Sequence, residues 1–220
     1  MKNIAFIIML FVATGLFAQK ITVQETNGKF LKENHNALLT TVYYSTAEDV
    51  EKELKSLFKS YKGKVKTKKG VILGDDLVIS SVSENTIDVF ATVKQLKDGE
   101  VEVLVAFYIG GADLSSSAHP DQYPRAQEII KNFALNLTEQ SFAEIVKEEE
   151  KELEKFTKDY EKVVENKEGL EKDNEDYKKQ IEQNEKEIEK LTKEIETLSG
   201  ELKEKQDAFE KLKKEGTKIK

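Results

Sequence analysis

The last third of the sequence repeats apolar side chains at steps of three and four residues. In IEKLTKEIETLSGELK, residues 188–203, charged or small polar residues fill the positions between Ile188, Leu191, Ile195, Leu198 and Leu202. A single helix in water gains nothing from so narrow an apolar stripe, so a second helix must cover it. The sequence therefore predicts a coiled coil over residues 141–215, followed by a disordered tail over 216–220.

The heptad phase stays the same along this segment when Leu153 is given position a. The residues expected to meet the partner helix at positions a and d are called the seam. They are Leu153, Phe156, Tyr160, Val163, Leu170, Asn174, Tyr177, Ile181, Ile188, Leu191, Ile195, Leu198, Leu202, Phe209 and Leu212.

The residues in the seam favour a coiled coil of two parallel helices. Ile at a with Leu at d, as in residues 181–198, is typical of parallel dimers, and a buried Asn such as Asn174 fixes their register. We expect a homodimer through residues 142–214. An antiparallel hairpin turning at residues 166–169 is the alternative within one chain, but the heptad phase runs through that stretch. A different protein as partner is the third possibility.

The start of the sequence is typical of a secretory signal. Lys2 precedes an apolar run over residues 4–17, and the small residue Ala18 follows it. The run is shorter than the about 20 residues that a membrane span needs. We expect cleavage after Ala18, a periplasmic or extracellular location and no membrane span in the mature chain; an uncleaved anchor is the alternative. The sequence contains no Cys, which excludes disulfides and lipid attachment through cysteine.

Residues 37–140 have the composition of a small folded domain, preceded by a segment, 19–36, that we expect to be flexible. Residues 37–44 are typical of a buried strand. Ser45 and Glu48 form a capping-box pattern before a helix that Gly63 ends. Strands are expected at 64–68, 77–81, 87–94 and 101–109, with a hairpin turn at 98–99. A second helix covers 124–137, and a bend, a new cap at Ser141 or a rotated face is expected near 138–142.

The sequence predicts the α+β class, with the overall order β-α-β-β-β-α, in which the strand-like run at 77–81 is not counted, and with helices packed on a small antiparallel sheet. Strand 101–109 is apolar on both faces, so we expect it at the centre of the sheet.

A cluster of lysines interrupts an otherwise acidic chain. The sequence has 42 Asp and Glu against 35 Lys and Arg, and this balance argues against binding to nucleic acid. Lysines on an edge strand protect a sheet from aggregation. The alternative is a docking surface for an anionic glycan or an acidic protein. The candidate residues are Lys59, Lys62, Lys64, Lys66, Lys68 and Lys69.

The sequence holds few residues that could carry chemistry. His119 lies near Ser115–Ser117 and Asp121, but a catalytic triad is defined by geometry, and a polar loop is the favoured interpretation. We expect His35 in a solvated turn and Gly74–Asp76 in a turn between strands. No catalytic, cofactor or metal site is predicted.

The function expected from the sequence is that of an exported, non-enzymatic structural or interaction protein of the cell envelope. Two alternatives remain. One is a binding module for an anionic ligand or glycan through residues 59–69, with a concave pocket beside them. The other is a holdase-like periplasmic chaperone.

Overall fold

A computed structural model describes residues 20–97 and 99–216, which form two compact units divided after Glu149. The expected signal peptide, residues 1–18, and residues 217–220 of the expected tail lie outside the described part. The N-terminal unit here means residues 20–149, and the C-terminal unit means residues 150–216.

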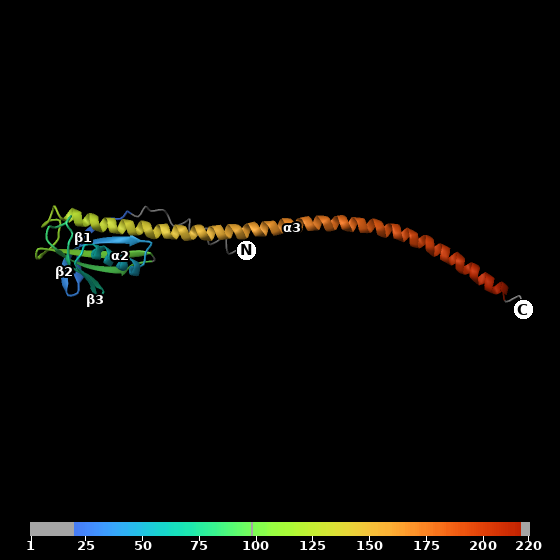
Figure 1. Ribbon diagram of the computed structural model, residues 1–220, viewed down its shortest axis with the longest axis horizontal. Helices are drawn as coiled ribbons and strands as arrows, with labels where there is room; N and C mark the ends of the chain where they lie inside the picture. Colours follow the sequence, from blue (N-terminus) through green and yellow to red (C-terminus); the bar gives the residue numbers. More distant parts are fainter. Residues whose placement is uncertain (1–19, 98, 217–220) are drawn as a thin grey trace. The chain divides into compact units, whose positions relative to one another are not determined.

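The N-terminal unit is built on one antiparallel sheet of seven strands, with helix α2 inserted after the second (Figure 1). The elements are β1 (Gln24–Phe30), β2 (Glu33–Tyr43), α2 (Ala47–Ser60), β3 (Lys64–Lys68), β4 (Val71–Leu77), β5 (Ile87–Gln95), β6 (Glu100–Ile109), β7 (Ala112–Asp113) and α3 (Tyr123–Gly216). Their order in the sheet is β1-β2-β6-β5-β4-β3, and β7 pairs with β6. The predicted α+β class is confirmed, and β6 lies at the centre of the sheet as expected.

The main core lies between one face of the sheet and the two helices. Val50, Leu54 and Phe58 of α2 are buried there with Ile130 and Ala134 of α3. The sheet contributes alternate residues of each strand, because side chains along a strand point to opposite faces. The helix-covered face carries Leu38, Val42, Val89, Ala91, Val101, Val103, Val105 and Phe107.

The other face of the sheet is called the open face, since no helix of the N-terminal unit contributes to its apolar cluster. That cluster contains the buried residues Phe30, Ala37, Val71 and Ala106 and the half-buried residues Leu73, Phe90 and Leu104. The second apolar face predicted for β6 therefore exists, and neighbouring side chains cover it.

The expectation of a flexible segment over residues 19–36 is wrong. Seven of these residues form β1, which pairs with β2 along its whole length, and β2 itself begins at Glu33. Phe30 and Ile21 are buried. A strand at the edge of a sheet buries few of its side chains, so the polar composition of β1 concealed it.

Helix α2 begins one residue later than the capping pattern predicted. Its N-cap is Thr46, whose Oγ1 accepts a hydrogen bond from the backbone N–H of Asp49 at 3.2 Å. The carboxylate of Asp49 in turn accepts a hydrogen bond from the Thr46 hydroxyl at 2.6 Å. Ser45 instead lies 3.2 Å from Ser141 of α3, Oγ to Oγ. The predicted cap at Ser45 is therefore wrong by one residue, and Ser45 packs on α3 instead.

The strand predicted at 77–81 and the turn predicted at Gly74–Asp76 are both wrong. β4 ends at Leu77, and the glycine and the two aspartates lie inside it, where its register with β5 shifts between Gly74 and Leu77. A Cβ on Gly74 would lie 2.6 Å from a methyl carbon of Leu77, so a side chain at this position would require Leu77 to move. Residues typical of turns also build β-bulges, which explains the error.

Helix α3 continues without a break through both places where the sequence suggested an interruption. Ser141 caps no new helix, and residues 166–169 are helical, which contradicts an intrachain hairpin at that point. Thr138 of the same helix accepts a hydrogen bond from the backbone N–H of Tyr43 at 3.1 Å, through its Oγ1. Contacts with the sheet thus extend past residue 137, where the predicted second helix ended.

Candidate interaction surfaces

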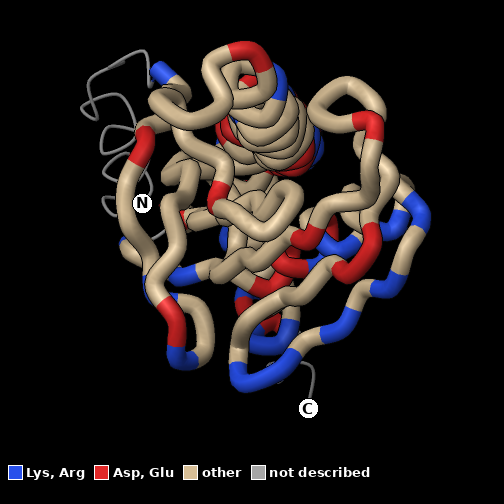
Figure 2. Tube along the Cα trace, turned by 90° about the vertical axis from the view of Figure 1, so that its left-hand side faces the viewer, with Lys and Arg blue, Asp and Glu red and all other residues tan. Residues whose placement is uncertain are grey.

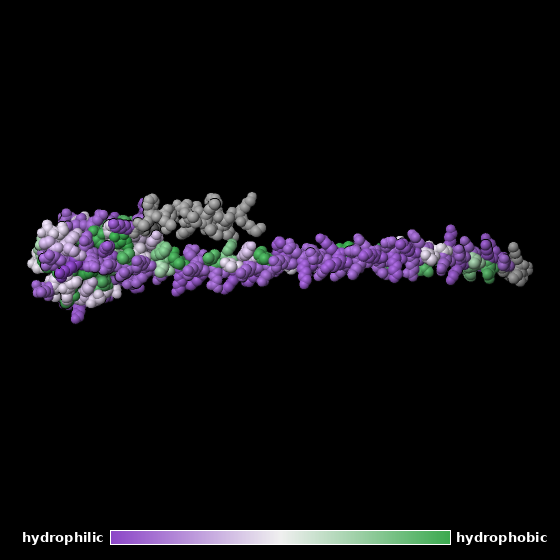
Figure 3. Space-filling model, turned by 90° about the horizontal axis from the view of Figure 1, so that it is seen from above, coloured by the Kyte–Doolittle hydropathy of each residue, from purple (hydrophilic) through white to green (hydrophobic). Residues whose placement is uncertain are grey.

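The seam residues of the C-terminal unit are exposed along its whole length. Their exposed fractions run from 46% for Leu191 to 70% for Leu212, whereas Leu54 in the main core is 0% exposed. Figure 3 shows apolar side chains of α3 at the surface at intervals, separated by hydrophilic ones. A single chain therefore leaves uncovered the stripe that the heptad pattern marks.

Ion pairs along the same helix stabilise the C-terminal unit only weakly. They join residues three or four apart, and the pairs Glu154–Lys158, Glu182–Lys186 and Glu189–Lys193 are among the shortest, at 2.6–2.8 Å. Such exposed pairs contribute about 0.3–0.5 kcal/mol each. These ion pairs do not cover the apolar stripe, whose side chains stay exposed in the single chain.

The charges beside the seam are unevenly distributed. Position g is mostly acidic, with Asp159, Asp173, Glu187, Glu194 and Glu201. In a parallel pair these acids face position e of the partner, which is mostly uncharged near the C-terminus and offers Lys178 to Asp173. In an antiparallel pair the rows of g residues face each other. Repulsion between like charges therefore disfavours the antiparallel arrangement.

Strand β3 is an outer strand of the sheet, as expected for a lysine-rich edge. Lys66 pairs with Leu73 and Lys68 with Val71, both members of the open-face cluster, so these lysines lie on the open face. Lys64, two residues before Lys66, shares that face. Figure 2 shows the lysines following one another along one edge of the sheet.

The other lysines of the cluster flank this strand. Lys59 lies in the last turn of α2, and Lys62 and Lys69 adopt positive φ angles in the turns before and after β3. All six are exposed, and within the described residues none forms an ion pair with a carboxylate. The edge therefore concentrates positive charge on an acidic protein, and the one carboxylate directly across from it on β4 is that of Asp75, opposite Lys64.

His35 does not lie in a solvated turn, so that expectation is wrong. It belongs to β2, is 8% exposed, and stacks on Phe90 of the open face at 4.8 Å between ring centroids. Its Nδ1 lies 2.7 Å from the carboxylate of Asp113, which also accepts the backbone N–H of Asn36 at 3.1 Å. The pair fixes the short strand β7 against β2. The polar sequence Glu-Asn-His-Asn is typical of a turn, so it did not indicate this role.

A second polar network lies beside His35. Glu25 accepts hydrogen bonds from the Asn36 amide at 2.8 Å and from the backbone N–H of Ser116 at 2.9 Å. A hydrogen bond from the Ser116 side chain is the main cause of the lowered pKa of Glu25, which burial opposes. A carboxylate with a lowered pKa stabilises the fold above its unfolded-state pKa, and this contribution disappears as the pH falls through the lowered value. The network therefore holds the loop at Ser116 to β1 and weakens in acid.

The polar loop at His119 is not arranged as a triad. Ser115 Oγ contacts Ser117 Oγ at 3.3 Å and accepts from the backbone N–H of Ala118. Nδ1 of His119 is buried and has no hydrogen-bond partner. No group of three or more metal-ligating side chains occurs among the residues that the structure describes.

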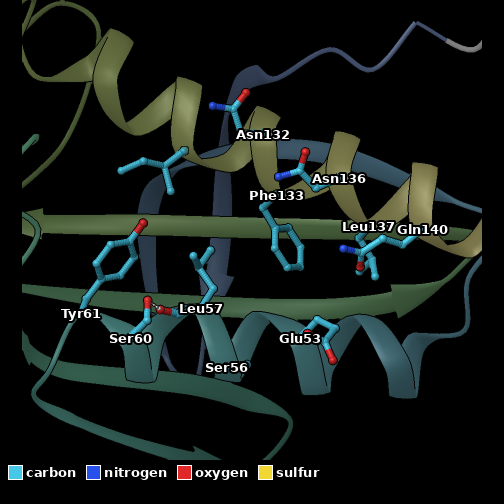
Figure 4. Close-up of a pocket in the computed structure, with 11 residues that line it drawn as sticks. Glu53, Ser56, Leu57, Ser60, Tyr61, Asn132, Phe133, Asn136, Leu137 and Gln140 are labelled. Atoms are coloured by element: carbon cyan, nitrogen blue, oxygen red, sulfur yellow. Dashed lines mark hydrogen bonds between the residues drawn. The ribbon is translucent and has the colours of Figure 1, made fainter.

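A groove of about 410 Å³ lies between α2 and α3 within the N-terminal unit. Figure 4 shows Phe133 pointing from α3 toward α2, with Tyr61 and Leu57 on the opposite side. Burial raises the pKa of the Tyr61 hydroxyl. The polar residues along the groove are Glu53, Ser56, Ser60, Asn132, Asn136 and Gln140, and no lysine lines it. This groove is not the anion pocket expected beside the lysine-rich strand.

Comparisons with known proteins place no constraint on these surfaces. No family model, no curated protein and no solved structure matches the chain. Within the described residues, no helix combines the length and the apolar character of a membrane span. The interpretation therefore depends on the geometry of the chain itself.

Proposed function

We propose that this chain is an exported, non-enzymatic structural protein of the cell envelope that associates with a second copy of itself. The α+β unit contacts other envelope components, and residues 142–214 form a parallel coiled coil. Export is supported by the basic and apolar start of the sequence, residues 2–18.

One observation carries self-association: the exposed seam of the C-terminal unit. Large apolar side chains recur on one stripe of α3 from Leu153 to Leu212, and each is at least 46% exposed. Covering one Ile or Leu side chain stabilises an assembly by about 1.5–3 kcal/mol. The heptad phase does not change along the stripe, so one partner helix can cover it along its whole length. The parallel orientation is supported by the row of acidic g residues described above.

The solution mass tests this proposal directly. We expect light scattering at micromolar concentration to give about twice the mass of one chain. A protein that stays monomeric at tens of micromolar would exclude the parallel dimer. Circular dichroism on the same sample should show that helix content falls on dilution, because packing of the apolar face supplies most of the stability of a helix in a protein.

A second candidate function is the binding of an anionic ligand at the β3 edge. It is favoured by the exposed, unpaired lysines described above. A basic surface attracts anions over about 8–10 Å in physiological salt. Protection of a sheet edge by lysine needs no binding partner, so the two roles differ in what they predict.

We expect charge reversal at this edge to weaken binding to heparin–agarose. The variant K64E/K66E/K68E should elute at clearly lower salt than the unchanged protein, because three cationic groups on one strand face become anionic. The matched control is K29E/K32E/K52E, which changes the net charge equally at exposed positions elsewhere in the N-terminal unit. Equal shifts for both variants would show that only net charge matters and would remove the proposed site.

A further inference from the structure

The N-terminal unit exposes apolar side chains on α3 before the C-terminal unit begins. Phe142 is 48% exposed, Val146 39% and Leu135 38%. Tyr44, at the end of β2, is 45% exposed and packs against Phe142 with ring centroids 5.1 Å apart. These four residues are called the Phe142 strip. They are not needed for the core of their own unit.

The strip lies on a different face of α3 from the residues that pack on the sheet. Phe142 follows the fully buried Ile130 by 12 positions, which at about 100° per residue is a rotation of roughly 120° around the helix. The core and the strip therefore occupy different sides of one continuous helix. The change of face expected near residues 138–142 is achieved by this rotation, without a bend or a new cap.

The strip shares the heptad phase of the seam. With Leu153 at position a, Val146 falls at a, and Phe142 and Leu135 fall at d. Glu149 and Glu139 occupy the remaining a and d positions in between, so the strip is a separate apolar contact on the same line. By sequence position, the strip therefore continues the a and d series of the seam.

The backbone around Tyr44 holds its ring beside this line. Tyr44 has a φ of 59°, a conformation that costs a non-glycine residue on the order of 1 kcal/mol or more. Gly99 lies against it, where a Cβ would come within 3.4 Å of the Tyr44 Cα, and Ser45 donates its N–H to the Gly99 carbonyl at 3.2 Å. Tyr44 thus keeps an unfavourable backbone conformation although burial of its ring in this chain is incomplete.

We propose that a second copy of this chain covers the Phe142 strip in a parallel, in-register pair, so that Phe142 meets Phe142 and the two Tyr44 rings flank the contact. This inference rests on the proposed self-association and adds the N-terminal unit to the interface. It also fixes orientation. In a fully overlapped antiparallel pair, Phe142 of one copy faces the other end of the coil, roughly 108 Å from its counterpart at 1.5 Å per residue.

The absence of cysteine from the sequence provides a clean test. Single variants F142C and V146C report on the strip, and L198C reports on the coil. Counterpart residues at a and d of a parallel pair approach closely enough for the 4.4–6.8 Å Cα separation of a disulfide. Q140C and T197C are the matched controls, because both are exposed on α3 outside the predicted interface.

Under mild oxidation, we expect F142C, V146C and L198C each to give mostly cross-linked dimer on non-reducing gels. Q140C and T197C should remain largely monomeric. Linking of L198C, with F142C and V146C no faster than Q140C, would overturn the strip contact and leave the coiled coil intact. Linking at the strip without L198C would instead refute the coil. If none of the three links, both the coil and the strip contact are refuted.

F142L keeps an apolar side chain and should retain the solution mass, whereas F142E should raise the dimer dissociation constant at least tenfold.

Discussion

Replacing Ile188 and Ile195 with lysine is expected to abolish the proposed self-association and leave a monomer. Both residues occupy position a, are exposed in the single chain and lie where the seam is most regular. A lysine at either place puts an ammonium group between two helices. The cost combines the loss of the apolar contact with the desolvation of a charge that has no partner.

The expected effect on affinity is large because a dimer contains each position twice. Four Ile side chains at about 1.5–3 kcal/mol each amount to roughly 6–12 kcal/mol. Since 1.4 kcal/mol is a tenfold change, the dissociation constant should rise by more than about four orders of magnitude. Light scattering should then give the mass of one chain, and circular dichroism should show loss of helix from the C-terminal unit.

The matched control adds lysines beside the seam. In Q183K/T197K two exposed residues at position c gain the same positive charges and remain in water. This variant should keep both the mass and the helix content of the unchanged protein. If I188K/I195K also stays dimeric, the stripe is not the interface. If the control dissociates equally, the loss reflects net charge rather than the seam.

The sequence predicted correctly those elements in which the spacing of apolar residues matches the buried face. Helix α2 buries Val50, Leu54 and Phe58 on the face expected for it, and β6 lies at the centre because both of its faces are apolar. In these elements the residue spacing alone determines which side chains leave water.

Elements stabilised by pairing or by a distant polar partner were not predictable in the same way. β1 buries little apart from Phe30, and its hydrogen bonds to β2 leave no trace in composition. His35 depends on Asp113, 78 residues later in the sequence, and on the ring of Phe90. The lysine cluster was visible in the sequence. Its position on the open face followed only from the pairing of β3 with β4.

The Phe142 strip is an intermediate case. Its heptad positions can be counted from the sequence, but whether Phe142 belongs to the domain core or to the surface depends on how α3 packs. Only the exposure of Phe142 and the contact with Tyr44 separate the two. Counting backward from the seam places Leu135 and Phe142 at position d, but the count does not show that their side chains are exposed.

Replacing Phe107 with alanine is expected to destabilise the N-terminal unit far more than replacing Phe90. Both residues lie in the middle of the sheet on paired strands, and they point to opposite faces. Phe107 is 1% exposed under the helices, so its removal leaves a cavity that costs about 3–5 kcal/mol. Phe90 is half-buried on the open face, and its removal should cost about 1–2 kcal/mol because part of its ring already contacts water.

The free energy of unfolding should be measured by hydrogen exchange of β2 and β6 amides, which report on the N-terminal unit separately from the C-terminal unit. With a total stability of about 5–15 kcal/mol for a domain of ordinary size, F107A should populate unfolded forms at modest urea concentrations. F90A should leave the slowest amides protected and should perturb those near His35. Equal losses for the two variants would mean that the open face is covered as completely as the helix face. That outcome would contradict the expected difference between the buried Phe107 and the half-buried Phe90.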